Sequence, residues 1–251
     1  PTVVDRWLQQ CVAQAITPKF EFDFKPYSYG FRPGKNAHQC VQQSQQYIND
    51  RLNHIVDIDL KNFFDEVDHC ILLQLLYRKV KCKTTLRLIR QWLRAPILIE
   101  GKLVKRRKGV PQGSPLSPLL SNIMLHELDR QLEKRNCKYV RYADDVLLGY
   151  IGTRQEAEEI KAQIKAWLHD TLHLALSEDK TLITHATDTP ARFLGYEIVN
   201  QQCNTKCTKG KRSVNGRIGL RVPHDVIAKK CEPYLRKGKP IHRPERLVNS
   251  D

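Results

Sequence analysis

The chain has 251 residues, of which 41% are hydrophobic, enough for one large domain or for one domain and part of another. It carries 42 Lys and Arg against 27 Asp and Glu, and the resulting net charge of +15 favours a polyanionic partner such as nucleic acid. No apolar run approaches the ~18 residues of a membrane-spanning helix, and no basic amphipathic helix is visible, so we expect no membrane association.

The eight cysteines are scattered singly, apart from Cys203 and Cys207, which have no matching second pair. This pattern predicts reduced thiols rather than a zinc site. No secretory signal is visible, so we expect an intracellular protein, cytoplasmic in a bacterium or organellar, and not a secreted one. The chain begins at PTVVDRW without a methionine, and we expect further residues upstream.

The first part of the chain predicts a helix, a loop, a second helix and a strand. Apolar residues at helical spacing predict a helix over residues 1–20. A loop rich in Gly, Pro and aromatic residues at 25–40 leads into a polar helix that ends near Asp50. The strict alternation of HIVDIDL, residues 54–60, predicts a strand that places Asp57 and Asp59 on the same face.

The middle of the chain predicts helices and one hairpin. Helices are expected over 70–80 and 84–94, followed by a hairpin that turns at Glu100-Gly101. A strong helix is expected to begin near Ser117-Pro118, because serine caps helices and proline fits the first turn.

The later part returns to strands around one more helix. KYVRYADDVLLGYI, residues 138–151, reads as a strand, a tight turn and a strand. A helix follows with a capping box of Thr153 and Glu156. TLITHA at 181–186 and RFLGYEIV at 192–199 are short strand candidates.

The irregular alternation of helices and strands, with hairpins, predicts an α+β fold with an antiparallel sheet flanked by helices. Composition changes after residue 200, since residues 201–251 hold thirteen Lys and Arg and four Asp and Glu. We therefore expect one unit over 1–200 and the start of another over 201–251.

Three carboxylates are candidates for a metal site. Asp59 ends a predicted strand, and Asp144 and Asp145 lie in the turn between two others. If these strands are neighbours, the acids converge, and such a cluster is favourable only around hard divalent cations that share oxygen ligands with substrate phosphates. Two such ions about 3.5–4 Å apart can activate a 3′-hydroxyl and stabilise a leaving pyrophosphate. On spacing alone, three unrelated surface aspartates are an equal alternative.

Six motifs in order resemble the blocks of reverse transcriptases. YADD within VRYADDVLLGY is similar to their palm hairpin, DIDLKNFFDEVDH to the preceding metal-binding motif, and GVPQGSPLSPLLSNIMLHELD to the block between them. LSEDKTLITH and RFLGYEI resemble two later blocks, and PTVVDRWLQQ with SYGFRPGKNAHQCV resembles an earlier one.

The details SYGFRPG, PQGSPLSPLLSNI and HRPERLVNSD resemble group II intron-encoded reverse transcriptase/maturases. The resemblance implies a right-hand polymerase with a palm, partial fingers and the beginning of an α-helical thumb. It implies an RNA-directed DNA polymerase that uses two Mg²⁺ ions, with Mn²⁺ as a possible substitute. Its partners would be group II intron RNA, an RNA template, a DNA primer or target, and a dNTP. A maturase role would assist splicing and retrohoming.

The resemblance also assigns the acids. Strand parity leaves Asp57 and Asp59 open, and the following aromatic and acidic positions favour Asp59. Asp59, Asp144 and Asp145 would be catalytic and would bind metal, with the backbone carbonyl of Leu60 as a further ligand.

The nucleotide would lie among Asn62, Phe63, Phe64, Gln112 and Lys180. Phe64 resembles the aromatic steric gate that excludes a 2′-hydroxyl, and since Phe63 is its neighbour, one ring should face the core and the other the site. The amide of Gln112 would bond the nucleotide or template.

The primer strand and the nucleic-acid backbone would contact two further sets of residues. The primer grip would be Phe193, Leu194, Gly195 and Tyr196, where glycine permits close backbone approach and an ordinary strand bulge is the alternative. Phosphate contacts are expected from Arg32, Lys35, Lys105, Arg106, Arg107, Lys108, Lys209, Lys211 and Arg212.

Two alternatives to an intron polymerase stay open. One is another bacterial reverse transcriptase, of the retron or CRISPR-associated kind. The other is a splicing-only maturase, a binding scaffold that would not need three converging acids. A viral RNA polymerase is disfavoured by Ala143 before the acids and by the aromatic Phe64. The oligomeric state is not determined by the sequence.

Overall fold

A computed structural model describes residues 2–49, 54–99, 101–150, 153–185, 190–201, 207–208, 211–212, 217–236 and 239–240. The helices are α1 (Val3–Glu21), α2 (Ala37–Asn49), α3 (Phe63–Glu66), α4 (His69–Lys79), α5 (Lys83–Arg94), α6 (Ser117–Lys134), α7 (Arg154–Trp167), a π-helical turn (Leu168–Leu172), α8 (His224–Cys231) and a 3-10 turn (Glu232–Tyr234). The strands are β1 (His54–Ile58), β2 (Ile97–Ile99), β3 (Lys102–Val104), β4 (Lys138–Tyr142), β5 (Asp145–Tyr150), β6 (Ile183–His185), β7 (Ala191–Phe193), β8 (Tyr196–Gln201), β9 (Cys207–Thr208), β10 (Lys211–Arg212), β11 (Arg217–Arg221), β12 (Leu235–Arg236) and β13 (Lys239–Pro240).

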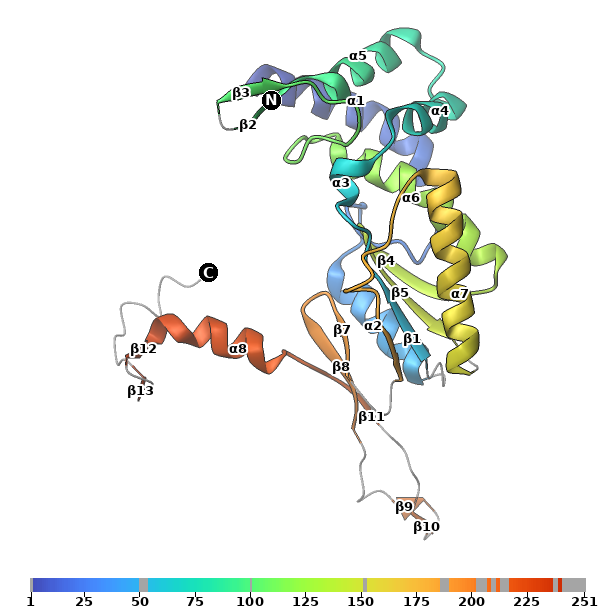
Figure 1. Cartoon of the computed structure of the whole chain (residues 1–251), viewed down its shortest axis with the longest axis vertical. Helices are drawn as coiled ribbons and strands as arrows, with labels where there is room; N and C mark the ends of the chain where they lie inside the picture. The colour runs from blue at the N-terminus through green and yellow to red at the C-terminus, as the bar shows by residue number, and fades with distance from the viewer. Residues whose placement is uncertain are drawn as a thin grey trace.

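A four-stranded sheet in the order β4-β5-β1-β6 forms the centre of the molecule (Figure 1). Its pairings are antiparallel, and β1 pairs with β5 in a register that sets Ile58 opposite Val146. The predicted α+β fold with an antiparallel sheet is therefore confirmed. None of the helices in the described part of the chain is long and apolar enough to span a membrane.

The alternation within β1 divides the core into two layers. Val56 and Ile58 pack into a core that holds buried residues of α4, α6 and α7. Ile55 faces the opposite way and packs with Leu147 and with the buried side of α2. Because both faces of the sheet are covered, a one-residue slip of β1 would exchange its two sets of side chains, so the register is strongly fixed.

Two local expectations are wrong. Ser117 was expected to cap α6, but the N-cap is Leu116, and the Ser117 hydroxyl donates a hydrogen bond to the carbonyl of Pro111 at 2.5 Å. RFLGYEIV was expected as one strand, but it is a tight hairpin in which β7 and β8 pair antiparallel around a two-residue loop, Leu194-Gly195. Both loop residues have positive φ, which a tight hairpin turn of this kind requires and glycine readily supplies. The predicted capping box of Thr153 and Glu156 is confirmed at α7.

The carboxyl-terminal part begins with a second sheet in the order β11-β8-β7 and continues into α8 (Figure 1). β8 crosses residue 200 and pairs with β11, so strand pairing joins the two units that the sequence separates there. The division into 1–200 and 201–251 stays a prediction. The six cysteines among the described side chains are free thiols: Cys11, Cys40, Cys70, Cys82, Cys137 and Cys231.

Candidate active site

The predicted acids lie at one end of the central sheet. Asp59 follows the last residue of β1, and Asp145 begins β5. One step beyond the pair Ile58–Val146, the antiparallel register brings these two aspartates to neighbouring strand ends. Asp144 precedes Asp145 in the β4–β5 loop, which also contains Ala143. The strand neighbourhood on which the sequence argument depended is therefore present.

A cavity of about 550 Å³ opens at this end of the sheet. Asp59, Asp144 and Asp145 all line it, whereas Asp57 is absent from its lining. The remaining lining residues are Leu60, Lys61, Asn62, Phe63, Phe64, Asp65, Gln112, Ser177 and Lys180. All nine residues predicted to bind metal or nucleotide thus contact one cavity, and their individual roles stay predictions.

The β4–β5 turn is held from below by the buried guanidinium of Arg141. Its Nε and Nη2 donate to the two carboxylate oxygens of Asp129 at 2.8 and 2.7 Å. Nη1 donates to Asn122 Oδ1 at 3.0 Å and to the carbonyl of Ala143 at 2.8 Å, and Nη2 donates to Ser28 Oγ at 2.7 Å. These five bonds match the five N–H donors of a guanidinium, so Arg141 links the turn rigidly to α6 and to the loop before α2.

Electrostatics explain why this buried cation persists. The side chains of Arg141 and Asp129 are both 0% exposed. Burial lowers the pKa of Arg141, but the Asp129 carboxylate outweighs burial and the net pKa lies above the ordinary value. Sequence reasoning missed this pair, although an arginine between the apolar and aromatic residues of the predicted strand KYVRY was a usable signal.

The turn is also packed from the side by the loop that contains SYGFRPG. The Tyr29 N–H donates to the carbonyl of Arg141 at 2.8 Å, and the Arg141 N–H donates to the carbonyl of Tyr27 at 2.9 Å. Gly30 lies so close that an added Cβ would be 2.3 Å from the backbone nitrogen of Ala143. Ala143 itself has φ of 57°, which places the loop in a left-handed conformation that L-residues adopt only when neighbours hold them.

The opposite wall of the cavity is α3 and the PQG segment. The Val110 N–H donates to the carbonyl of Phe64 at 2.7 Å, and the Gly109 N–H donates to the carbonyl of Val67 at 2.7 Å. A Cβ at Gly109 would be 2.7 Å from the carbonyl oxygen of Asp65, and its φ is 88°. Only glycine permits this approach, and the approach places the exposed Gln112 at the cavity rim.

A segment after α7 closes the site behind the first acid. The Ser177 N–H donates to the carbonyl of Asp59 at 2.9 Å, and the Lys61 N–H donates to the carbonyl of Ala175 at 2.9 Å. This pairing brings the Lys180 ammonium to 3.3 Å from Asp59 Oδ2. Lys180 therefore pairs with one of the three carboxylates at the edge of the cavity.

Burial and mutual repulsion perturb the acids. Burial raises the pKa of Asp144, and the Asp59 carboxylate raises it further. Burial raises the pKa of Asp145 to about 6, with Asp144 and then Asp59 adding to the shift. Asp57 lies next to this group, and burial followed by the charges of Asp145 and Asp59 raises its pKa to about 7. Such a cluster gains stability from a nearby cation.

The donor set fits hard divalent cations. Carboxylate oxygens are the ligands that Mg²⁺ takes, usually from one or two acids together with water and substrate phosphates. Among the described residues, no group of three or more His, Cys, Asp or Glu side chains is arranged so that it could hold a metal ion. Asp59, Asp144 and Asp145 line the same cavity and lie close enough for the Asp59 charge to raise the pKa of the other two.

Phe63 and Phe64 differ in burial, as expected if one ring faces the core and the other faces the cavity. Phe63 is 1% exposed and belongs to the core, whereas Phe64 is only partly buried and packs edge-on against it with ring centroids 5.2 Å apart. Asn62 precedes α3 with φ of 49°. The less buried ring is therefore Phe64, the residue predicted as the steric gate.

The predicted primer grip lies outside the lining of this cavity. Phe193 is buried in the layer beneath β1, and Leu194-Gly195 form the β7–β8 turn. The Tyr196 ring meets His38 at 6.5 Å between centroids. Gly195, at the turn of this hairpin, is exposed. A contact between this turn and a primer strand stays a prediction.

The basic residues predicted to contact phosphates differ in whether their side chains are exposed or already paired within the protein. Arg32 donates to Glu21 and to the carbonyls of Lys25 and Ser28, and its side chain is only 7% exposed. Lys35 donates to the carbonyl of Pro26 and lies 4.5 Å from the Tyr29 ring centroid. Both therefore brace their own loop in this structure.

The other residues predicted to contact phosphates lie directly after β3, at 105–108, or in the carboxyl-terminal part, at 209–212. Lys105 and Arg107 are exposed, Lys108 pairs with Glu66, and Arg106 is half-buried. Lys209 lies outside the described residues. Lys211 and Arg212 form β10, and nothing is described of their side chains.

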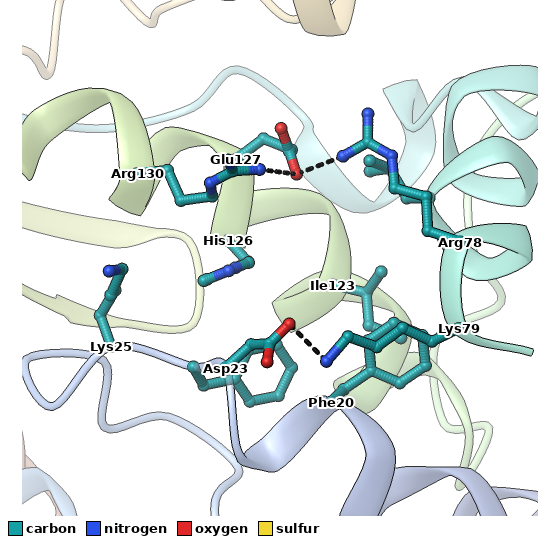
Figure 2. Close-up of a pocket in the computed structure, with 11 residues that line it drawn as sticks. Phe20, Asp23, Lys25, Arg78, Lys79, Ile123, His126, Glu127 and Arg130 are labelled. Atoms are coloured by element: carbon teal, nitrogen blue, oxygen red, sulfur yellow. Dashed lines mark hydrogen bonds and ion pairs between the residues drawn. The ribbon is translucent and has the colours of Figure 1, made fainter. Parts of the chain in front are cut away.

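A second cavity of about 430 Å³ lies between the end of α1, α4 and α6 (Figure 2). Its charges are largely paired with one another, since Lys79 contacts Asp23 and Glu127 accepts from both Arg78 and Arg130 (Figure 2). It contains none of the clustered acids, so it is not an alternative place for the metal chemistry.

Comparison with known proteins agrees with this geometry. Residues 1–198 match the family model described as reverse transcriptase (RNA-dependent DNA polymerase). The chain is 32% identical to the group II intron-encoded protein LtrA of Lactococcus lactis subsp. cremoris, over 100% of this chain and 54% of that protein. It is 30% identical to protein YkfC of Escherichia coli, over 80% of this chain and 62% of that protein.

The fold also resembles that of solved telomerases. A telomerase from Candida albicans, in complex with a fragment of telomeric RNA, aligns with a TM-score of 0.57 at 16% identity, over 82% of this chain and 38% of that chain. The chain spans about half the length of LtrA. Taken with the family match over residues 1–198 and the acids that meet at the sheet end, the chain belongs to the reverse transcriptase family and is an RNA-directed DNA polymerase domain whose homologues are group II intron-encoded proteins.

Proposed function

We propose that this chain is the polymerase part of a group II intron reverse transcriptase that also acts as a maturase. The observation that carries the proposal is the meeting of Asp59, Asp144 and Asp145 in one cavity with Phe64 and Gln112. It would extend a DNA primer on an RNA template from dNTPs. It would also bind its intron RNA to assist splicing and retrohoming, in a bacterial cytoplasm or an organelle.

The three aspartates would hold the catalytic cations, with the Leu60 carbonyl as a further oxygen ligand. Bound Mg²⁺, or Mn²⁺ as a substitute, supplies activation of the primer 3′-hydroxyl and charge stabilisation of the leaving pyrophosphate. Lys180, 3.3 Å from Asp59, would neutralise triphosphate charge. Phe64 would occupy the space that a ribose 2′-hydroxyl needs, and Gln112 would bond the nucleotide or template at the rim.

Primer extension on an RNA template with dNTPs and Mg²⁺ tests the polymerase. Changes at the partners of metal ligands typically cost about 10–100-fold, so Asp59→Asn and Asp144→Asn should each lower extension by more than about 100-fold. The matched control is Asp179→Asn, an exposed acid beside Lys180 that is absent from the cavity lining. Extension that survives the first two changes would reject the site.

Phe64→Ala tests the gate. Removal of the ring should raise incorporation of rNTPs relative to dNTPs, because the excluded volume beneath the sugar disappears. Phe20→Leu is the comparison, since Phe20 is buried in the core and absent from the cavity lining, and it should alter stability without changing the ratio. An unchanged rNTP-to-dNTP ratio in Phe64→Ala would reject the assignment.

Binding to a candidate intron RNA, with splicing as the readout, tests the maturase role. Tight, salt-sensitive binding that accelerates splicing is expected. Extension without any effect on an intron would favour a retron or CRISPR-associated enzyme. Splicing without extension would favour a maturase that has no polymerase activity.

A further inference from the structure

Residues 69–126 hold most of the excess positive charge of the chain. They contain twelve Lys and Arg but a single acid, Glu100. The active site uses none of these cations, and the predicted phosphate contacts include only the four that end this segment, Lys105 to Lys108. Of the others, Lys102 begins β3, and the rest lie on or beside α4 and α5.

The exposed face of α5 carries four cations in one row. Lys83, Arg87, Arg90 and Arg94 are all exposed. Their spacing of four, three and four residues keeps them within about 60° of arc around a 3.6-residue helix. The row extends about 16 Å along the helix axis, roughly the length of five base-pair steps. Ile89 and Leu93, on the other side of α5, are buried and fix this face outward.

The row lacks acidic partners. Within the described part of the chain, no carboxylate pairs with any of these four side chains, although exposed cations elsewhere, such as Arg78 and Lys165, have such pairs. Four like charges on one helix face repel one another, which destabilises the helix slightly. A polyanion laid along the face would remove that repulsion.

An apolar hollow lies beside the row. It has a volume of about 470 Å³ and is lined by Leu73, Gln74 and Tyr77 of α4 and by Lys83, Leu86, Arg87 and Arg90 of α5. Tyr77 is 54% exposed, and the Lys81 ammonium lies 4.2 Å from its ring centroid. An exposed aromatic ring flanked by cations is suited to stack a nucleic-acid base.

The basic surface continues toward the hairpin before the active site. Arg94 and Arg106 both lie close enough to His69 to lower its pKa, after the larger effect of burial. One guanidinium nitrogen of Arg106 is buried with no hydrogen-bond partner in the described structure. The row on α5 therefore leads to the end of β3, where Lys105 and Arg107 are exposed.

We propose that the α5 row, Lys83, Arg87, Arg90 and Arg94, with the Tyr77 hollow, binds a structured RNA outside the polymerase cleft. The row would contact consecutive phosphates, and the hollow would receive one unpaired base. Folded RNA supplies both features, because helical segments present phosphates while bulges and loops present unstacked bases. A uniform duplex offers no free base, and a membrane surface offers no base at all.

The test measures binding of the whole chain to a labelled RNA hairpin with one bulged nucleotide, at several salt concentrations. Arg87→Gln/Arg90→Gln should lower the slope of log affinity against log salt by about 1.4 to 1.8, because two phosphate contacts are lost. Arg87→Lys/Arg90→Lys should keep the slope. The matched control, Lys134→Gln/Lys138→Gln, removes two exposed lysines outside this surface and should also keep it.

Tyr77→Ala tests the hollow. It should weaken binding of the bulged hairpin by about tenfold or more, and leave binding of the same hairpin without the bulge unchanged. Equal slopes in the Arg-to-Gln variant and the unmodified protein would overturn the proposal. An equal decrease of the salt slope in the Lys134→Gln/Lys138→Gln control would also overturn it. So would an Arg-to-Gln variant that binds the RNA hairpin normally but binds phosphatidylserine vesicles more weakly than the unmodified protein does.

The inference adds a surface to the proposed function, and the two fail separately. Asp144→Asn should lose primer extension and still bind the bulged hairpin with the full salt slope. An Asp144→Asn protein that extends primers rejects the active site without touching the α5 surface. If Asp144→Asn abolishes primer extension while Arg87→Gln/Arg90→Gln leaves the salt slope of RNA binding unchanged, the α5 surface alone is rejected.

Discussion

Replacement of Arg141 should show that a buried ion pair holds the catalytic turn. Arg141→Met removes five hydrogen bonds and leaves the 0% exposed Asp129 carboxylate without its cation. Loss of one partner of a buried pair typically costs about 3–5 kcal/mol, because the remaining charge stays desolvated. Urea unfolding followed by circular dichroism at pH 7 should show a loss of this size.

The double variant Arg141→Met/Asp129→Leu separates stability from positioning. Replacement of both charges by apolar side chains is often neutral or stabilising, so much of the lost free energy of unfolding should return. Primer extension should remain low, because no group replaces the bond from Arg141 to the carbonyl of Ala143. A cost under about 1 kcal/mol for Arg141→Met, or full recovery of extension in the double variant, would refute the reasoning.

Three further predictions concern the same region. Gly30→Ala should lower extension by at least about tenfold, since its Cβ would meet the Ala143 nitrogen at 2.3 Å and shift the turn. Burial lowers the pKa of His69, so the unfolded state binds its proton more tightly and stability falls as pH drops below about 6.5. His69→Gln should therefore reduce the dependence of the melting temperature on pH between pH 5 and 7. Mg²⁺ should raise the melting temperature of the unmodified protein by binding the folded state, and Asp59→Asn should abolish this shift.

Local pattern was enough for most elements of this fold. The alternation of HIVDIDL predicted β1 and the placement of Val56 and Ile58 in one layer. The Thr153–Glu156 capping box predicted the start of α7, because both partners of that motif are three residues apart in the chain. The family motifs singled out the acids at Asp59, Asp144 and Asp145, which the structure brings to one cavity.

Predictions failed where a partner distant in the chain decides. Ser117 would cap a helix in isolation, but its hydroxyl is taken by the Pro111 carbonyl. The phosphate contact of Arg32 stays a prediction, although Glu21 and two loop carbonyls accept hydrogen bonds from its guanidinium in this structure. Strand parity could not choose between Asp57 and Asp59. The motif positions that follow favoured Asp59, and the cavity lining, which includes Asp59 but not Asp57, agrees with that choice.

The sequence by itself was enough to predict metal-dependent chemistry on a nucleic acid. The paired acids, the aromatic pair and the excess of basic residues can all be read from residue types and their order. Only the tertiary structure decided which groups act together. The register of β1 against β5 sets Asp59 beside the turn, and the bonds of Arg141 to Asp129, Asn122 and Ser28 hold that turn from segments up to 113 residues away. Antiparallel pairing and burial join residues regardless of their separation along the chain, so no local pattern could have specified them.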